Sequence, residues 1–413
     1  MRNRVVITGM GVVSSLGDSP IALHSSLCDG RSGARPIQLF DPAALACQLS
    51  AEVPSFDGQQ YLSGRNLRPL NRTARLVASA AKLALQDSGW SEPLRCEEEV
   101  GLVLGTMFCS LQTISAFDRR ALEAGPAFAS PLDFSNTVIN AAAGQTAIFH
   151  NLRGINSTIS AGTTSGLQAI SYAADVIRSG RSHVILAGGA DELCFESFYG
   201  FERAGRLCRS DDSAGDFPIP FDSRRNGMVL GEGAALLVLE DAAYARERGV
   251  KAIAEIVGHG SSYDCSQGTD ERHAAEAVAS SVQQALIDAG VQPHEIDCLS
   301  ASANGSPAGD RHEAQGVFLG LNGLTRHLPV TAIKSMLGET LGAAAALQTI
   351  SLVETMLDGV LPGICNLQEV EADFPFNLAS SDNREIDMRT GLINSVGFDG
   401  QCCSLVLSRS AKN

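Results

Sequence analysis

Several features that mark secreted, membrane or nucleic-acid-binding proteins are missing from this sequence of 413 residues. Positive charge is scarce, because 31 Lys and Arg stand against 46 Asp and Glu, giving a net charge of −15. This balance argues against nucleic acid or an anionic membrane as the main partner. No uncharged apolar stretch reaches the length of about 18 residues that a membrane span needs, and the start shows no signal-peptide pattern. We therefore expect a cytoplasmic protein with no membrane span and no nucleic-acid partner.

Motifs for metals and nucleotide cofactors are also missing. The 11 cysteines are scattered, without a Cys-x-x-Cys pair, so neither a zinc site nor a disulfide scaffold is expected. No Gly-x-Gly-x-x-Gly pattern opens a helix, which argues against a dinucleotide site. The segment from Gly162 to Gly166 is not a Gly-x-Ser-x-Gly hydrolase turn, because Gly166 follows Ser165 directly. The sequence predicts no metal, no cofactor and no hydrolase.

What the sequence does contain is an alternation of two patterns. Short, continuous apolar runs predict strands buried on both faces; they lie at residues 4–13, 100–104, 184–187, 234–239, 252–257, 296–301, 330–333, 391–396 and 403–407. Apolar residues at helical spacing predict helices at residues 73–88, 165–177, 271–289 and 342–357. The alternation predicts an α/β sandwich of two similar halves, residues 1–245 and 246–413, with no linker between them.

Three segments carry more specific information. The first is Phe-Asp-Ser-Arg-Arg-Asn-Gly-Met-Val-Leu-Gly-Glu-Gly-Ala at residues 221–234, and the others are residues 9–13 and 334–338. With these motifs in this order, the chain resembles the β-ketoacyl-[acyl carrier protein] synthases of fatty acid and polyketide assembly from about residue 3 to residue 409. The resemblance implies a thiolase-type five-layer αβαβα sandwich and pairing of two subunits. It also implies a substrate that is an acyl chain linked through phosphopantetheine to an acyl carrier protein.

The catalytic set of that family is a cysteine and two histidines, and the resemblance places other residues at all three positions. Thr163 stands at the cysteine position, in Ala-Gly-Thr-Thr-Ser-Gly. Ser302 stands at the first histidine and Glu339 at the second, whereas the lysine that accompanies these three residues in the family is kept as Lys334. Gln348 replaces a glutamate that catalytic relatives usually have.

These replacements have physical consequences. A threonine hydroxyl is a weak nucleophile without a base to remove its proton, whereas a thiolate forms readily at a helix N-terminus. An ionised Glu339 only accepts hydrogen bonds and would repel a developing enolate. The gating loop reads Gly397-Phe398-Asp399-Gly400, so a charged side chain replaces a glycine of the family's Gly-Phe-Gly-Gly. We expect a subunit that does not condense by itself.

Family members of this kind are chain-length factors, which pair with an active ketosynthase in a heterodimer or heterotetramer and close its acyl tunnel. The resemblance places tunnel and interface candidates at Phe108, Gln112 and Phe117, with small residues at Ala141 and Ala142 on a neighbouring helix. Bulky side chains there would limit chain length by filling volume. Aromatic-polyketide chain-length factors typically have glutamine at the cysteine position, so the aryl polyene or a related polyene branch is favoured.

Alternative interpretations stay open beside these. Thr163 is either a nucleophile with an unforeseen base, making the chain an active synthase or acyltransferase, or a hydroxyl that caps the next helix. His312 is either a replacement for a lost histidine or, as we expect from helical spacing, a residue on a solvated face. Phe108 and Phe117 fit core packing as well as a gate. A basic group either docks an acidic carrier protein or forms a solvated helix face; its members are Arg65, Arg68, Arg72 and Arg75. A purely structural or carrier-docking protein is the third possible function.

Overall fold

The computed structural model describes residues 3–62, 66–90, 94, 99–209, 218–371, 374–376, 378 and 382–410. The strands of its main sheet are β1 (Val5–Ser14), β4 (Gly101–Gly105), β5 (Asn156–Ile159), β6 (Val184–Asp191), β7 (Gly233–Asp241), β8 (Ala254–Tyr263), β9 (Cys298–Ser300), β10 (Val330–Thr331), β13 (Thr390–Val396) and β14 (Gln401–Arg409). Two short pairs lie apart from it, β2 (Arg35–Pro36) with β3 (Leu49–Ser50) and β11 (Val360–Leu361) with β12 (Arg384–Glu385).

The helices connect and cover these strands. They are α1 (Pro20–Cys28), α2 (Gly58–Tyr61), α3 (Arg72–Asp87), α4 (Leu111–Ala124), α5 (Pro131–Phe134), α6 (Ala141–His150), α7 (Ser165–Arg178), α8 (Phe195–Arg203), α9 (Ala242–Glu247), α10 (Glu271–Ala289), α11 (Pro307–Gly320), α12 (Lys334–Leu337) and α13 (Ala344–Asp358). Single 3-10 turns are η1 (Pro126–Phe128), η2 (Pro293–Glu295) and η3 (Leu341–Ala343).

The sheet has the same internal order in its two halves. Within the described residues the order is β10-β9-β13-β14-β8-β1-β7-β6-β4-β5. From either edge inward, two parallel pairs are followed by two antiparallel pairs, and the halves meet where β1 pairs antiparallel with β8. The predicted sandwich of two similar halves is therefore confirmed. The change of half falls between β7 and β8, where α9 lies, and residue 245 as the boundary stays a prediction.

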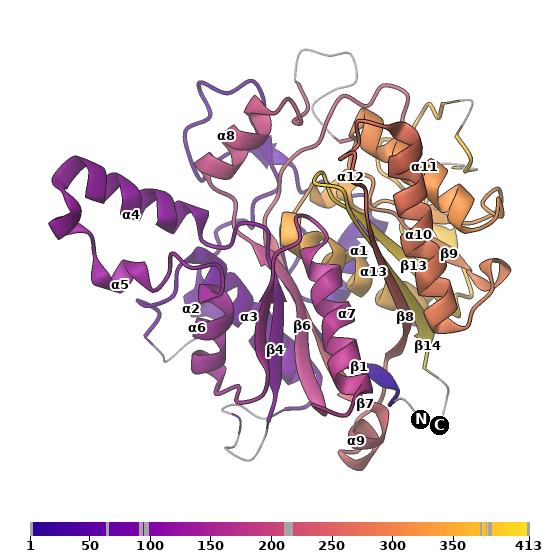
Figure 1. Ribbon diagram of the computed structural model, residues 1–413, viewed down its shortest axis with the longest axis horizontal. Coiled ribbons are helices and arrows are strands. Elements are labelled where there is room, and N and C mark those ends of the chain that lie inside the picture. Colours follow the sequence, from indigo (N-terminus) through magenta and orange to yellow (C-terminus); the bar gives the residue numbers. More distant parts are fainter. Residues whose placement is uncertain are drawn as a thin grey trace.

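Helices divide the molecule into five layers (Figure 1). The central layer is α7 with α13, the outer layers are α3 with α6 and α10 with α11, and sheet lies between them. The strand β7 shows why its apolar run is continuous. Its residues Ala235, Leu237 and Leu239 enter the central cluster, and Ala234, Leu236 and Val238 enter the cluster beneath α3. Both faces of the strand are thus buried, as its sequence predicts.

Backbone of the two halves lies in close contact at the start of α7 and near the end of β6. A side chain at Gly166 or Gly189 would overlap the carbonyl oxygen of Gly342 in the turn before α13. Only glycine allows backbone to lie this close. The N-terminus of α7, which carries the nucleophile position of the sequence prediction, is therefore held against the segment that carries Glu339.

One part of the molecule projects from these layers. Figure 1 shows α4 and α5 extending away from the body, and no residue of α4 is buried. The arm has large apolar side chains on its surface, Leu122, Phe128 and Phe134, which are 86%, 67% and 59% exposed. In the part of the chain that the structure describes, no helix is long and apolar enough to cross a membrane.

Candidate functional site

Thr163 lies in the turn that leads into α7, and its side chain is buried. Its Oγ1 donates a hydrogen bond to the carbonyl oxygen of Val396 at 3.3 Å, its only hydrogen-bond partner within the described ranges. The residue at the helix cap is Thr164, whose hydroxyl donates to the Ala161 carbonyl instead of capping. The prediction that Thr163 caps α7 is therefore wrong, because the hydroxyl is turned across the domain interface toward β13. Among the described residues, no base contacts it there.

Ser302, Lys334 and Glu339 form one buried hydrogen-bond network. Lys334 Nζ lies 2.8 Å from Glu339 Oε2 and 3.2 Å from Ser302 Oγ. The Glu339 carboxylate also accepts hydrogen bonds from Asn304 Nδ2 at 2.9 Å and from the backbone N–H of Leu341 at 3.1 Å. The lysine and glutamate side chains are 2% and 1% exposed. The charge of each is thus balanced by the other, and both oxygens of the carboxylate are occupied.

The four positions that the resemblance singles out come together in space. Ser302 Oγ accepts a hydrogen bond from the N–H of Val396 at 3.0 Å, and the carbonyl of the same residue accepts from Thr163. A continuous chain of contacts therefore runs from Thr163 through Val396 and Ser302 to Lys334 and Glu339. Every link is a hydrogen bond or an ion pair, and no imidazole or thiol takes part.

Gln348 lies on α13 next to this network and is fully buried. Its Nε2 donates to the carbonyl oxygens of Ser300, Ala301 and Asn394. An ionised glutamate at this position would have no N–H to donate to these three carbonyl oxygens, because a carboxylate only accepts hydrogen bonds. The amide therefore suits the surroundings that this chain provides.

The loop Gly397-Phe398-Asp399-Gly400 closes the site from the side of β13 and β14. A Cβ on Gly162 would lie within 2.8 Å of the Asp399 carboxylate, so Asp399 packs against the turn that carries Thr163. A negative charge at the start of a helix is favoured by the helix dipole. It also opposes the formation of a second negative charge at Thr163.

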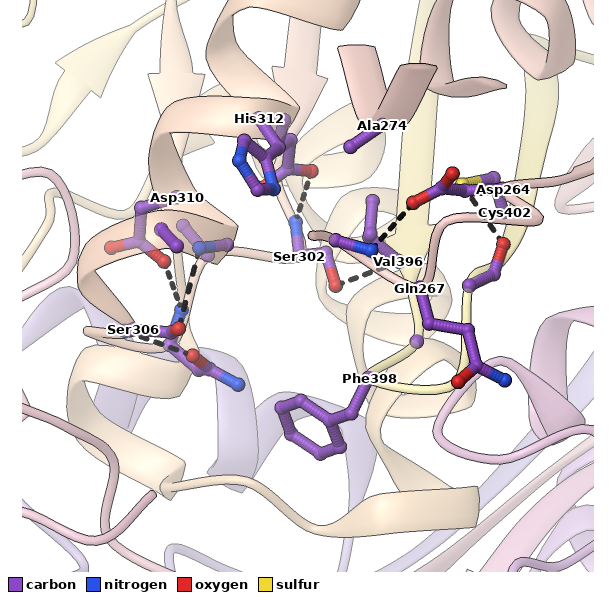
Figure 2. Close-up of a pocket in the computed structure, with 18 of the residues that line it drawn as sticks. Asp264, Gln267, Ala274, Ser302, Ser306, Asp310, His312, Val396, Phe398 and Cys402 are labelled. Carbon is purple, nitrogen blue, oxygen red and sulfur yellow. Dashed lines mark hydrogen bonds between the residues drawn. The ribbon is translucent and has the colours of Figure 1, made fainter. Parts of the chain in front are cut away.

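A cavity of about 330 Å³ opens beside the network (Figure 2). Ser302, His312 and Phe398 lie around it in the figure, and Glu313 is a further lining residue. Glu313 Oε1 accepts hydrogen bonds from the N–H of Ser302 and from Asn394 Nδ2, whereas Oε2 has no hydrogen-bond partner in the part of the chain that the structure describes. Burial raises the pKa of Glu313 to about 7. Among the described residues, no group of three His, Cys, Asp or Glu side chains is placed to hold a metal ion.

His312 is not on a solvated face, so that prediction is wrong. It is 6% exposed, lines the cavity, and burial lowers its pKa. The reason is that α11 is covered on two sides: Gly316 and Gly320 pack closely against Val278 and Val282 of α10, and the loop at Gly268 covers His312. Sequence reasoning also missed Glu313. The available signal was its spacing of three residues from Asp310, which places the two carboxyl groups on one face of a helix.

The tunnel candidates occupy two different places. The Phe108 ring contacts that of Phe201 at 6.1 Å between centroids, and Phe201 in turn contacts Phe398 of the loop at residues 397–400 at 5.6 Å. Phe117 instead packs against Phe134 on the projecting arm, at 6.0 Å. Gln112 is exposed beside it, and both line an open pocket under α4. Ala141 and Ala142 are buried at the start of α6.

The basic group predicted as a docking or solvated face does not form one surface. Arg72 pairs with the buried Glu232, and Arg75 donates to the backbone carbonyls of Leu67 and Leu70. Arg68 is exposed. Arg65 lies outside the described residues. Two of the four charges are therefore directed into the structure.

Comparisons with known proteins agree with this geometry. The description "Beta-ketoacyl synthase, N-terminal domain" matches residues 2–245, and "Beta-ketoacyl synthase, C-terminal domain" matches residues 253–368. The 3-oxoacyl-[acyl-carrier-protein] synthase 2 of Vibrio harveyi is 33% identical, with all of both chains covered. The oxytetracycline polyketide putative beta-ketoacyl synthase 1 of Streptomyces rimosus is 32% identical over 99% of this chain and 98% of that one. Among solved structures, the ishigamide ketosynthase/chain length factor matches all of both chains, with 31% identity and a TM-score of 0.91.

Proposed function

The chain belongs to the β-ketoacyl synthase family, whose thiolase-type fold it has, and we propose that it is a chain-length-factor-like subunit that does not condense by itself. In this proposal it pairs with an active ketosynthase in the cytoplasm. The complex elongates acyl chains on an acyl carrier protein by decarboxylative Claisen condensation, and this subunit shapes the acyl tunnel. Its two halves are residues 1–245 and 246–413.

The observation that carries the proposal is the buried ion pair between Lys334 and Glu339. Decarboxylative condensation forms an enolate, which donors or positive charge must stabilise. Here the ammonium group of Lys334 is neutralised by Glu339, and the carboxylate occupies the position of the second histidine. The hydroxyl of Thr163 donates to a backbone carbonyl and contacts no base among the described residues. Neither acylation nor enolate formation has the groups it needs.

Exposed apolar surface supports pairing with another subunit. The arm formed by α4 and α5 exposes apolar side chains, and Ile148 on α6 is 78% exposed. Val138 and Ile139, in the segment between α5 and α6, are 43% and 44% exposed. Apolar surface of this extent typically marks an interface. A chain length factor is also named in the ishigamide structure that this chain resembles at 31% identity.

The polyene branch, and an aryl polyene in particular, is a finer proposal. It rests on Thr163, because aromatic-polyketide chain-length factors typically have glutamine at that position. Analysis of the product that the purified complex releases tests it, since a conjugated polyene and an aromatic polyketide differ in absorption spectrum and mass.

The deciding experiment compares the chain alone with the chain co-expressed with a ketosynthase that keeps the Cys-His-His set. We expect a one-to-one complex by native mass, no condensation by this chain alone, and no acyl adduct on it after incubation with acyl carrier thioesters. Thr163→Ala in this chain should leave the activity of the complex intact, whereas replacing the partner's cysteine by alanine should abolish it. Condensation by this chain alone, with an adduct at Thr163, would instead establish the atypical active synthase. A complex whose product length is unchanged by every interface substitution would indicate a structural or docking role.

A further inference from the structure

Two consecutive buried carboxylates, Asp191 and Glu192, lie at the end of β6 and outside the chain of contacts described above. Asp191 is fully buried. Its Oδ1 accepts hydrogen bonds from the backbone N–H groups of Phe108 and Cys109 at 3.0 and 2.9 Å, and its Oδ2 accepts from Met107 at 2.7 Å. Three successive amides of one segment thus converge on one carboxylate.

Asp191 has two further donors. Thr106 Oγ1 donates to it at 2.7 Å, and the N–H of Gly342 donates to Oδ2 at 2.8 Å. Burial raises the pKa of Asp191, and these donors oppose that rise. Every partner is a donor, which an ionised carboxylate satisfies at both oxygens. Because Gly342 follows Leu341, whose N–H donates to Glu339, the same carboxylate joins the segment at Phe108 to the turn beside the site.

Glu192 holds the starts of two helices. Its Oε1 accepts a hydrogen bond from the N–H of Gln112 in the first turn of α4, and its Oε2 accepts from the N–H of Thr73 in the first turn of α3, both at 3.2 Å. First-turn amides have no partner within their own helix, so a carboxylate there satisfies them and complements the helix dipole. At the N-cap of α4, Ser110 makes no side-chain capping bond.

The attachment of α4 to the body therefore depends on polar contacts at its root. No residue of α4 is buried, so apolar packing does little to fix its direction. Besides Glu192, the root is held by Asn71 Nδ2, which donates to Ser110 Oγ at 2.6 Å, and by Thr73 Oγ1, which donates to the carbonyl of Cys109 at 2.7 Å. On the side of α4, the residues that make these contacts are Cys109, Ser110 and Gln112.

We propose that Asp191 and Glu192 are positioning residues that fix the segment Thr106–Gln112 and, through it, the wall that Phe108 presents to an acyl chain. Neither carboxylate touches the reacting atoms. Their effect on product length passes through the backbone of the segment. When its amides are hydrogen-bonded to the carboxylates, the Phe108 ring occupies one position. When these hydrogen bonds are lost, the ring occupies several positions. This inference rests on the proposed function, in which the segment shapes the tunnel of a complex.

The test is Asp191→Asn, with Asp222→Asn as the matched control. Asp222 is also fully buried and also accepts hydrogen bonds from three backbone amides, those of Arg224, Gln368 and Glu369, none of which belongs to this segment. Its carboxylate also pairs with the side chain of Arg224. An asparagine at residue 191 replaces one carboxylate oxygen by an NH2 group. This group is a donor and would face backbone N–H groups, which are donors as well. In the chain alone we expect hydrogen exchange at the amides of residues 107–109 to be faster by about 10- to 100-fold, as loss of charge-assisted hydrogen bonds implies. In the complex with a co-expressed ketosynthase we expect a broader distribution of product lengths. The control should change neither.

Phe108→Ala separates failure of this inference from failure of the proposed function. If Phe108→Ala changes product length and Asp191→Asn does not, the positioning role is wrong. If neither variant changes product length, the tunnel role of this chain fails and the inference fails with it. Unchanged exchange at residues 107–109 in Asp191→Asn would also overturn the inference. Should that variant not fold, Glu192→Gln gives the same test at the amide of Gln112, where faster exchange and a broader length distribution are expected.

Discussion

Lys334 and Glu339 form a buried ion pair, with 2.8 Å between Nζ and Oε2 and almost no exposure of either side chain. In the proposed function, Lys334 is the one lysine kept from the family's catalytic residues, and the Glu339 carboxylate pairs with it at the position of a histidine. The energetic role of the ion pair can be measured separately from any activity.

Removing one partner of this pair should be far more destabilising than removing both. Lys334→Met leaves Glu339 as an uncompensated buried charge, and we expect the free energy of unfolding to fall by about 3–5 kcal/mol. In the double variant Lys334→Met with Glu339→Leu, the free energy of unfolding should fall clearly less than in either single variant. Denaturant unfolding of the four proteins in the double-mutant cycle measures this. The exposed pair of Arg272 and Glu276 is the control, for which the loss should be below about 1 kcal/mol. A loss in Lys334→Met no larger than in Arg272→Ala would contradict the prediction.

A cysteine at residue 163 should restore acylation but not condensation. The thiol is a better nucleophile than the hydroxyl, and the start of α7 favours the thiolate. Asp399 packs against the same turn and opposes that charge, so the variant with Thr163→Cys and Asp399→Gly should acylate faster than Thr163→Cys alone. Intact-protein mass after incubation with an acyl thioester measures the adduct. Neither the natural chain nor Thr163→Ser should form one, and no variant should condense, since Ser302 and Glu339 supply no imidazole. An adduct on the natural chain would disprove the assignment of Thr163 as inert.

Phe108→Ala should lengthen the products of the complex by at least one extension unit. Phe108 is linked through Phe201 to Phe398, so removing its ring vacates volume next to the gating loop, which a longer chain can fill. Phe117→Ala should have a smaller effect, because Phe117 packs against Phe134 on the arm. Product length distributions by mass spectrometry measure both. Phe318→Ala, a partly exposed phenylalanine on α11, is the control and should change nothing. A larger shift from Phe117→Ala would place the gate under α4.

Glu313→Gln should change how stability depends on pH. The pKa of Glu313 in the folded protein is about 7, above the value of about 4.3 for an unperturbed glutamate. Between these values the folded protein binds a proton that the unfolded chain has released, so the contribution of this group to the free energy of unfolding falls as pH rises through the window. Because Oε2 has no hydrogen-bond partner, glutamine fits without losing an acceptor in use. The free energy of unfolding of the variant, relative to that of the natural chain, should therefore rise by on the order of 1–3 kcal/mol as the pH rises from about 5 to about 8.

Unfolding measured across that pH range tests this expectation, with Glu276→Gln on the exposed side of α10 as the control. A difference between Glu313→Gln and the natural chain that is constant with pH would contradict it.

Much of the fold follows from local patterns. The predicted ranges agree within a few residues with helices α7 and α10 and with strands β4 and β7. The reason is that the spacing of apolar residues, and the glycines that end an element, act within a short segment. The position of His312 did not follow. Its helix is covered by α10 on one side and by the loop at Gly268 on another, and no periodicity within one segment reports what distant segments cover.

The same division holds for the site. The sequence by itself determined that residues 163, 302 and 339 carry neither a thiol nor an imidazole, because residue types are chemical facts that folding does not alter. The tertiary structure decided what these residues do instead. It joined Thr163 to Val396, neutralised Lys334 with Glu339, and left one oxygen of Glu313 unpaired beside a cavity. These outcomes depend on contacts between segments far apart in the chain, and such contacts are set by the packing of the layers.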